Sequence, residues 1–301
     1  MRVFVTGASG HIGSAVLPEL LAAGHQVTGL ARAESSAAVV SAAGAAVLPG
    51  AIDDLDLLRS AAADADGVIH LAFKHETMRS GDMQGAAGAD LAAIEAMLDA
   101  LAGTDKPFVG TSGTLLLAMA VPGRIGTETD VAPGGPRVDA ENLTIDAAAR
   151  GVRSSVIRLP PTVHSSLDHH GFIPTLIGIA RARGVAGYIG DGANRWPAGN
   201  TLDAGHLYRL ALESAPAGSR LHAVGDEGVP FKEIAEAIGR NLGLPVASIA
   251  AEDANEHFDF LGGLVQLDNP TSSELTRKLL GWAPTHPGLI ADMDEGHYFR
   301  G

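Results

Sequence analysis

Three glycines near the N-terminus have the spacing of a phosphate-binding turn. Gly7, Gly10 and Gly13 lie in the stretch TGASGHIG, directly after a short apolar run and before a longer one with helical spacing. In such a turn the first glycine permits a tight reversal, the second lets a pyrophosphate approach the backbone, and the third lets helix and strand pack closely. Backbone N–H groups at the start of the helix then face the phosphates. The pattern predicts dinucleotide binding, with a purely structural turn as the alternative.

Two charged residues after the next apolar run bear on which dinucleotide binds. Arg32 stands where an acidic residue would accept hydrogen bonds from the ribose 2′-hydroxyl of NAD. A guanidinium there suits the 2′-phosphate of NADP instead. Glu34, two residues on, can still face the ribose, and an exposed arginine without a ligand is the alternative. We therefore expect NADP, with NAD as the second option.

A group of histidines follows the segment RLPPTV. His164 is expected at the mouth of a cleft, where an imidazole that titrates near neutrality can pass a proton. A polar loop residue bonded to backbone is the alternative. Asp168, His169 and His170 are adjacent and offer no pair spaced four residues apart on one helix face, so no metal site is predicted.

The elements that must position these residues alternate along the first half of the chain. Short apolar runs predict strands at residues 2–6, 26–31, 46–48, 67–71, 107–111 and 153–159. Segments with helical spacing lie between them, for example at 12–23 and 87–101. This alternation is typical of βαβ units with right-handed crossovers. The predicted fold class is α/β, with a Rossmann-type doubly wound parallel sheet.

The alternation of strand and helix segments changes after about residue 160, and this change predicts a smaller C-terminal substrate lobe. PPTVHSSLDHHGF and YIGDGANRWPAGNTLD are expected to be loops, and RLHAVGDEG a strand. Helices are expected at 173–183, in VPFKEIAEAIGRNLG and in TSSELTRKLLGW. The predicted core spans residues 1–163, with 198–225 returning to it. The predicted lobe comprises 164–197 and 226–301.

Composition excludes several classes of function. The 301 residues are 46% hydrophobic and carry a formal net charge of −14, which disfavours a nucleic-acid or anionic-membrane surface as partner. The absence of cysteine excludes disulfides, a thiol nucleophile and a cysteine-based zinc site. No apolar run is long enough to span a bilayer, and the first residues lead directly into a strand rather than a cleavable leader. We expect a cytoplasmic protein with a small-molecule substrate.

Taken in order, these motifs resemble the extended and atypical short-chain dehydrogenase/reductase superfamily. GVIHLAF is similar to its fourth strand, VGTSGT to its fifth strand with the active-site serine, and VIRLPPTVH to its sixth strand and the loop that reaches the nicotinamide. GDGANRWPAGNTLDAGHLYRLAL and LTRKLLGWAPTHPGL are similar to the later segments of the superfamily. The resemblance covers nearly the whole chain and also allows a homodimer.

The resemblance implies roles for individual residues. Tyr188, Arg195 and Trp196 would face the substrate, Arg195 as a clamp for an anion and Trp196 as a stacking partner, with lobe packing as the alternative. The superfamily's acidic residue after the third strand is replaced by Ala51 and Ile52, unless Asp53 substitutes. Cofactor contacts are implied for Gly7, Ser9, Gly10, His11, Ile12, Gly13, Arg32, Ala51, Ile52, Leu71, Ala72, Phe73, Thr111, Arg137, Pro160, Thr162 and Val163.

The superfamily's proton-transfer pair, a tyrosine followed four residues later by a lysine, has no counterpart. The tyrosines are Tyr188, Tyr208 and Tyr298, and none has a lysine four residues on. In the helix expected within GGPRVDAENLTIDAAARG, Arg137 stands near the lysine position. It can bind ribose hydroxyls, but with a pKa above about 12 it cannot act as an acid.

Other residues must then handle the proton. The resemblance leaves Ser112 to orient a carbonyl and His164 to supply the proton, directly or through water. His70 and His75 flank the fourth strand and are expected to be structural or near the cofactor.

These expectations favour an NADP-dependent oxidoreductase that acts on a small carbonyl or alcohol. One alternative is a non-enzymatic NADP-binding redox sensor, which would keep the glycine turn without the tyrosine and lysine. Another is a sugar-nucleotide epimerase or dehydratase. That reaction depends on the missing pair and on cationic clamps, of which Arg195 is the one obvious candidate.

Overall fold

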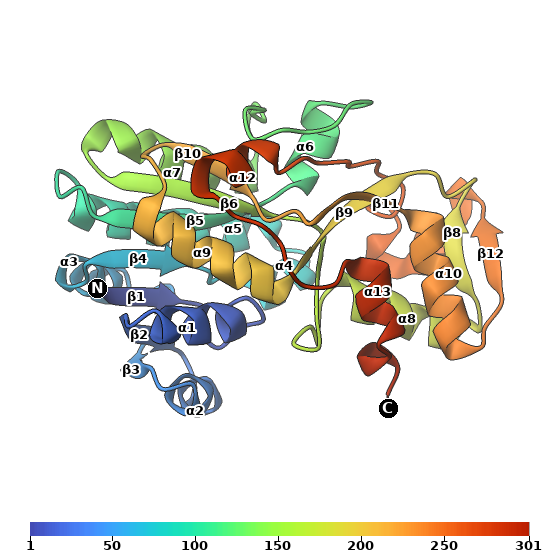
Figure 1. Cartoon of the computed structure of the whole chain (residues 1–301), viewed down its shortest axis with the longest axis horizontal. Coiled ribbons are helices and arrows are strands. Elements are labelled where there is room, and N and C mark those ends of the chain that lie inside the picture. The colour runs from blue at the N-terminus through green and yellow to red at the C-terminus, as the bar shows by residue number, and fades with distance from the viewer. Residues whose placement is uncertain (301) are drawn as a thin grey trace.

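The apolar runs of the first half form the strands of one parallel sheet (Figure 1). The computed structural model describes residues 1–300, and its sheet has the order β10-β6-β5-β4-β1-β2-β3. The order reverses between β1 and β4, which is where doubly wound folds bind ligands. The predicted fold class is therefore confirmed. The strands are β1 Arg2–Thr6, β2 Gln26–Ala31, β3 Ala46–Pro49, β4 Gly67–His70, β5 Pro107–Gly113, β6 Arg153–Leu159 and β10 Ser219–His222.

Helices cover both faces of this sheet (Figure 1). On one face α1 (Gly13–Ala22) packs against α9 (Thr201–Ser214), and α2 (Glu34–Ala42) lies beside β2 and β3. On the other face α5 (Met83–Leu101) lies between α3 and α7. Each face has its own apolar core, because the strands are buried on both sides. The remaining helices of this lobe are α3 Leu55–Asp64, α4 His75–Arg79, α6 Leu115–Ala120 and α7 Pro136–Asp146.

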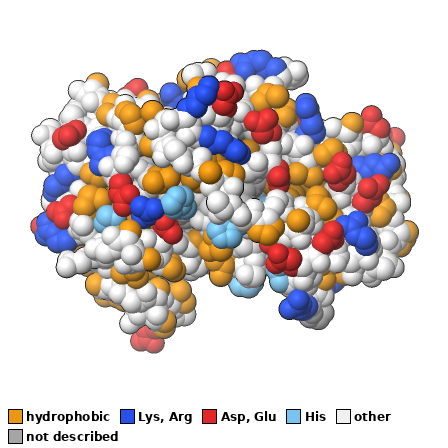
Figure 2. Space-filling view, viewed as in Figure 1, with side chains coloured by type: hydrophobic (Ala, Val, Ile, Leu, Met, Phe, Trp, Pro, Cys, Tyr) orange, Lys and Arg blue, Asp and Glu red, His pale blue; other side chains and the backbone are white. Residues whose placement is uncertain are grey.

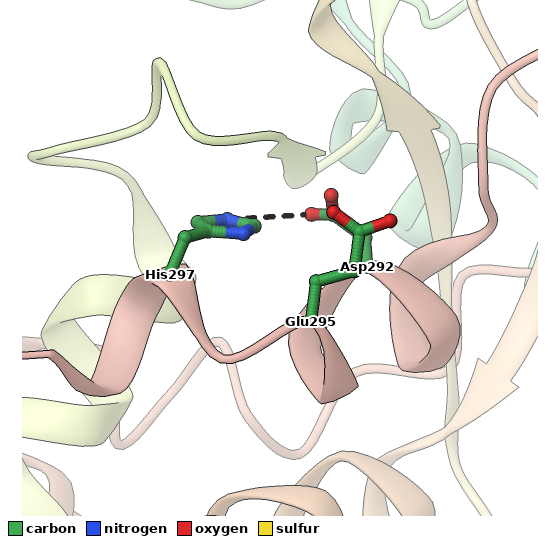
Figure 3. A group of neighbouring side chains, drawn as sticks. All are labelled: Asp292, Glu295 and His297. Atoms are coloured by element: carbon green, nitrogen blue, oxygen red, sulfur yellow. Dashed lines mark ion pairs between the residues drawn. The ribbon is translucent and has the colours of Figure 1, made fainter.

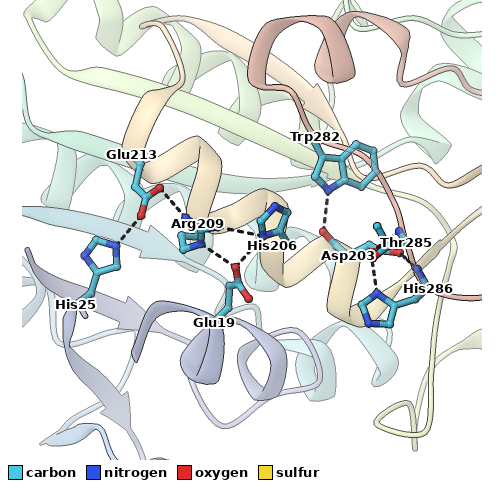
Figure 4. Close-up of polar contacts among 9 residues, drawn as sticks. All are labelled: Glu19, His25, Asp203, His206, Arg209, Glu213, Trp282, Thr285 and His286. Atoms are coloured by element: carbon cyan, nitrogen blue, oxygen red, sulfur yellow. Dashed lines mark hydrogen bonds and ion pairs between the residues drawn. The ribbon is translucent and has the colours of Figure 1, made fainter. Parts of the chain in front are cut away.

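Polar contacts fix α9 to its neighbours (Figure 4). Arg209 donates from Nε to Oε1 of Glu19 on α1 across 2.7 Å. In the first turn of α9, the buried Asp203 accepts from the backbone N–H of Thr285 at 3.0 Å, and its carbonyl accepts from Nε1 of Trp282 at 3.0 Å. The segment around residue 285 is thereby held against the start of α9.

A second lobe lies at one end of the sheet (Figure 1). It has a three-stranded sheet in the order β11-β9-β7 and a parallel pair of β12 and β8. Its core contains the aromatic rings of Trp196, Phe231 and Phe258. The elements are β7 Thr162–His164, β8 Ala186–Ile189, β9 Arg195–Asn200, β11 Asp226–Pro230, β12 Val246–Ile249, α8 Phe172–Arg183, α10 Phe231–Leu242, α11 Ala254–Phe258 and α13 Leu289–Asp294.

Helix α12 (Glu274–Leu280) contacts β10 and α9 rather than the second lobe. The tail of the chain thus crosses back to the large sheet before it returns to the small lobe at α13. The boundaries expected between core and lobe stay a prediction.

Strands lie in both segments that were expected to be loops, so that expectation was wrong. PPTVHSSLDHHGF contains β7, and YIGDGANRWPAGNTLD contains β9 and the end of β8. The glycines and prolines of these segments suggest turns, but Gly199 lies within strand β9 and is required by close packing. A Cβ at Gly199 would lie 2.2 Å from the carbonyl oxygen of Ala223. RLHAVGDEG likewise forms two strands, β10 in the large sheet and β11 in the small one.

The surface mixes charges of both signs. Figure 2 shows acidic and basic side chains interspersed over one face, with several histidines near its middle. No helix within residues 1–300 combines the length and the apolar composition that crossing a bilayer requires.

Candidate active site

Two of the three glycines in the first turn are required by close packing. Gly7 has φ of +66°, and a Cβ on it would lie 2.7 Å from the backbone N of Ala72. A Cβ on Gly13 would lie 2.3 Å from the carbonyl oxygen of Ala8. At Gly7 the turn between β1 and α1 therefore presses against the segment after β4, whereas Gly13 lets the start of α1 pack against the turn itself.

Gly10 is different, because a Cβ there would meet only the carbonyl oxygen of Gly7, at 3.2 Å. Space thus remains in front of Gly10 at the start of α1. Within residues 1–300, no hydrogen bond uses the backbone N–H of His11, Ile12 or Gly13. Free N–H groups at a helix start attract anions. The turn therefore fits the phosphates of a dinucleotide.

His11 connects this turn to the second lobe. Its Nε2 lies 2.8 Å from Oγ1 of Thr201, which also donates to the carbonyl oxygen of His164 and accepts from Ser165. Because the hydroxyl proton of Thr201 is already donated to His164, the His11 ring must donate to Thr201 through Nε2. Burial holds the pKa of His11 below its usual value, which favours this neutral form.

Arg32 lies at the end of β2 with most of its side chain in solvent. The side chain is 70% exposed, and Nη2 is 3.4 Å from Oε2 of Glu76. Nearby, Lys74 donates to Asp53 across 2.7 Å. The guanidinium is thus free to meet a phosphate, with one weak carboxylate partner to displace.

The end of β3 offers less to a cofactor than the resemblance implies. The backbone N–H of Ala51 already donates to Oδ2 of Asp54 at 2.7 Å, and the side chain of Ile52 packs against the core. Asp53, the expected substitute, is engaged by Lys74.

A buried chain of hydrogen bonds runs from β1 to α7. Oγ1 of Thr6 accepts from the backbone N–H of Leu71 and Ala72, so its own proton goes to Nδ1 of His70, 2.7 Å away. Nε2 of His70 must then carry a proton, which it donates to Oδ1 of Asp90 at 3.0 Å. The chain fixes the tautomer of His70 and orients the Asp90 carboxylate, which is almost fully buried.

Arg137 completes this chain from the first turn of α7. Its Nη1 donates to Oδ2 of Asp90 at 2.9 Å, and its guanidinium carbon lies 4.1 Å from the centre of the Phe73 ring. Nη2 reaches the carbonyl oxygen of Thr111 at 3.4 Å. Arg137 is therefore held at the carboxyl ends of β4 and β5, in the crevice where such folds bind ligands. Three of the residues with implied cofactor contacts, Phe73, Thr111 and Arg137, are brought together here.

None of the three tyrosines is free to act as an acid in this crevice. Tyr208 is fully buried and hydrogen-bonded to Oγ1 of Thr111 at 2.8 Å, and burial raises its pKa above the usual value. Tyr298 bonds Asp168 in the second lobe, and its pKa is also raised, chiefly by burial. Tyr188 lies on β8 beside Lys232.

Ser112 and His164, the predicted catalytic residues, are both enclosed. Ser112 is 4% exposed, and its Oγ lies beside Glu141 without a hydrogen bond. His164 is 1% exposed, its Nδ1 bonds Oδ2 of Asp292 at 2.9 Å, and its Nε2 is buried without a partner. Their catalytic roles stay a prediction, and each role requires the enclosing segments to open.

The serine is enclosed because a buried ion-pair network lies under α7. Glu141 accepts two hydrogen bonds from Arg158 and one from Arg220, the latter at 2.9 Å. Burial alone would raise the pKa of Glu141, but the polar groups around it, chiefly Arg158 and with it Arg220, together lower the pKa. The network ties α7 to β6 and β10, and thus fixes the helix that carries Arg137.

His75 is a titratable group near Arg137, and the sequence predicts only that it lies close to the fourth strand or the cofactor. It begins α4, is exposed, and its ring packs edge-on against Phe73 with centres 5.2 Å apart. Partial burial lowers its pKa, and the nearby charges of Arg137 and Arg79 lower it further. The signal in the sequence was a histidine in the segment after the fourth strand, and its closeness to Arg137 depends on how α7 packs.

The three residues predicted to face a substrate do not converge. Trp196 is fully buried and packs edge-on against Phe231, with ring centres 5.0 Å apart. Arg195 is held by Asp268, with its Nη2 at 2.8 Å from Oδ2. Tyr188 belongs to another sheet. Trp196 thus has the packing role that was its alternative.

The nicotinamide-side segment after β6 is well fixed. Thr162 donates from Oγ1 to the carbonyl oxygen of Pro197 at 2.7 Å, so its hydroxyl is engaged in a hydrogen bond to strand β9. Pro160 is buried and Val163 is half-buried. Contacts of this segment with a cofactor stay a prediction.

Several known proteins are similar to this chain in sequence. A protein of Schizosaccharomyces pombe with no described function is 48% identical over 301 residues, covering 99% of this chain and all of that protein. A similar protein of Saccharomyces cerevisiae is 43% identical over 298 residues, covering 97% of this chain and 98% of that one. A 2′-dehydrokanamycin reductase of Streptomyces kanamyceticus is 27% identical, covering 86% and 72% of the two chains.

A solved structure shares the fold. The dTDP-glucose 4,6-dehydratase DesIV of Streptomyces venezuelae, with NAD and TYD bound, superposes with a TM-score of 0.77 at 21% identity, covering 98% of this chain and 96% of that one. The sequence model of the NAD dependent epimerase/dehydratase family matches residues 3–223, from β1 to just past β10. This chain belongs to the NAD dependent epimerase/dehydratase family.

Proposed function

We propose that the protein is an NADP-dependent oxidoreductase that acts on a small carbonyl or alcohol compound. The observation that carries the proposal is the glycine turn, where Gly10 leaves space before the free N–H groups that open α1. The exposed Arg32 supports NADP over NAD, because a guanidinium can pair with a 2′-phosphate. The likeness to a reductase of Streptomyces kanamyceticus supports carbonyl chemistry.

Bound NADPH would supply a hydride to the carbonyl carbon of a substrate, whose oxygen then takes one proton to become an alcohol. Arg137 would hold the nicotinamide ribose or the substrate oxygen, since Asp90 and the carbonyl oxygen of Thr111 take up two of the five N–H donors of its guanidinium. A cation there also stabilises negative charge that develops on the oxygen.

His75 is the group that would exchange the proton in this scheme. It is exposed, it titrates, and it shares Phe73 with Arg137. Because its pKa is lowered, the ring is mostly neutral at pH 7 and suited to accept a proton during alcohol oxidation. Carbonyl reduction needs the protonated ring and should accelerate as the pH falls.

A redox sensor without catalysis is the second candidate. The enclosure of Ser112 and His164 favours it, because neither side chain reaches solvent as the molecule stands. Such a sensor would bind NADPH tightly at the same turn and turn over nothing.

A screen of aldehydes, ketones and quinones with NADPH separates the two candidates. Loss of NADPH absorbance with at least one class, reduced about tenfold or more in His75→Asn, supports the enzyme and the proton role. Tight NADPH binding without turnover supports the sensor. A rate that is unchanged in His75→Asn would remove His75 from the scheme while leaving the oxidoreductase standing.

A further inference from the structure

Three side chains near the C-terminus converge outside the cofactor crevice. Asp292 lies on α13, Glu295 follows this helix, and His297 begins the next short turn of helix. One ligand atom from each lies within 4.8 Å of the others. Figure 3 shows the two carboxylates side by side, facing the imidazole ring. This is a mixed nitrogen and oxygen donor set, which transition metals accept.

The spacing within this cluster suits a shared cation better than a hydrogen bond. Nε2 of His297 is 3.7 Å from Oδ2 of Asp292, too far for a hydrogen bond. Two ligands on one tetrahedral zinc ion lie about 3.4 Å apart, given metal–ligand bonds of about 2.0–2.2 Å. Nε2 of His297 is also buried without a hydrogen-bond partner among residues 1–300. A buried ring nitrogen without a partner needs an explanation, and a metal ion supplies one.

Charge around the cluster favours a cation. Within the described chain, no lysine or arginine side chain pairs with the carboxylate of Asp292 or Glu295. The neighbouring Asp294 is neutralised by Arg240 at 2.7 Å. Two carboxylates without a lysine or arginine partner, beside one imidazole, attract a divalent ion.

His164 serves as an outer support for Asp292. Its Nδ1 donates to Oδ2 of Asp292 across 2.9 Å, and both side chains are buried. Outer hydrogen bonds of this kind orient metal-binding side chains and strengthen the site. This role also gives the buried ring of His164 a structural function.

We propose that Asp292, Glu295 and His297 bind a divalent transition-metal ion such as Zn²⁺, with water at the open positions. The site would hold the C-terminal segment in place. Next to it, Tyr298 accepts from the backbone N–H of Ser165 at 3.1 Å and donates to Asp168 at 3.2 Å, so the ion would stabilise the contact with the loop after β7. The inference is independent of the proposed function.

Calorimetric titration of the untagged, chelator-treated full chain with ZnCl₂ tests the site. We expect one ion per chain, with affinity at least about tenfold weaker in Glu295→Gln and in His297→Ala. Asp294→Asn is the matched control, since it removes a neighbouring carboxylate that faces Arg240, and it should bind zinc like the wild type. Zinc should also raise the midpoint of thermal unfolding in the wild type and not in Glu295→Gln.

Two results would overturn the proposal. One is the absence of stoichiometric binding. The other is equal affinity in the wild type and Glu295→Gln, which would mean adventitious binding elsewhere. Because Glu295 is exposed, its substitution keeps the fold, so the test stands even if His297→Ala unfolds.

Discussion

The Nη1 atom of Arg137 donates to Oδ2 of Asp90 across 2.9 Å and so joins the start of α7 to α5. The other oxygen of the same carboxylate accepts from His70, whose tautomer is set by Thr6. Arg137, for which the sequence predicts only a place near a helix start, is therefore held by Asp90, the carbonyl oxygen of Thr111 and the ring of Phe73. Arg137, which we expect near the lysine position of the superfamily, is thus a cation with its own support.

Asp90→Asn tests this support. The asparagine side chain has the shape of the aspartate but not its charge, so it holds the guanidinium of Arg137 less firmly. A cofactor that Arg137 contacts is then bound less firmly as well. We expect the Kd for NADPH to rise about three- to tenfold, measured by the fluorescence of the bound cofactor. Asp146→Asn, an exposed carboxylate on the same helix α7, should leave the Kd unchanged. Equal Kd values for Asp90→Asn and the wild type would show that the chain does not support cofactor binding.

The two kinds of glycine in the first turn should respond differently to substitution. Gly10→Val adds methyl groups to the space where a pyrophosphate would lie, so NADPH affinity should fall at least about tenfold while the melting temperature stays near the wild-type value. Gly7→Ala meets backbone atoms at a positive φ and should cost more than about 2 kcal/mol of unfolding free energy. Tight NADPH binding by Gly10→Val would place the phosphates elsewhere.

Arg32 should decide between the two dinucleotides. Loss of one charged hydrogen bond to a phosphate is worth about 1.5–3 kcal/mol, so Arg32→Ala should weaken NADPH binding roughly 10- to 100-fold and leave NADH binding nearly unchanged. Arg59→Ala, another exposed arginine, serves as the control. An equal loss for both cofactors would argue against a 2′-phosphate at this position.

Glu141 should be essential to the fold rather than to chemistry. Glu141→Gln leaves the buried guanidinium of Arg158 without its counter-charge, at a cost of about 3–5 kcal/mol in the free energy of unfolding. Urea denaturation measures this cost directly. A loss below about 1 kcal/mol would mean that the network relaxes or admits water.

His222 should make stability fall as the pH is lowered. Nδ1 of His222 donates to the carbonyl oxygen of Ser272 and Nε2 faces Arg158, so the buried ring is neutral. Burial lowers the pKa of His222 to about 4. The charge of Arg158 lowers this pKa further, and the charges of Glu128 and Glu141 oppose the shift. An unfolded histidine titrates near pH 6.5, so unfolding takes up a proton between about pH 6.5 and 4. The unfolding free energy should then decrease by about 1.4 kcal/mol per pH unit from this group.

His222→Asn should show a shallower decrease over the same pH range, measured by urea denaturation at several pH values. If the two slopes coincide, His222 is not the source of the pH dependence.

The sequence was sufficient for the parts of the molecule that local patterns determine. The strands at 2–6, 26–31 and 153–159 have the predicted bounds, because each is a short segment rich in strand-forming residues and is mostly buried. The glycine turn was also predictable from a local pattern, because the spacing of its glycines reflects the close approach of β1, α1 and the segment after β4.

The rest depends on contacts between distant segments. His164 looked like a residue at a cleft mouth, but α13, more than a hundred residues later, supplies Asp292 and encloses it. Trp196 looked like a stacking surface, and the packing of α8 and α10 around β9 buries it. No local pattern contains that information, because the partners are set by how the small lobe assembles.

Titration of the wild-type protein with NADPH and with NADH tests the central claim most directly. Saturable binding of one NADPH per chain, at least about tenfold tighter than NADH, is the result that free N–H groups at the glycine turn and an exposed Arg32 predict. Saturation by neither dinucleotide at millimolar concentration would contradict it.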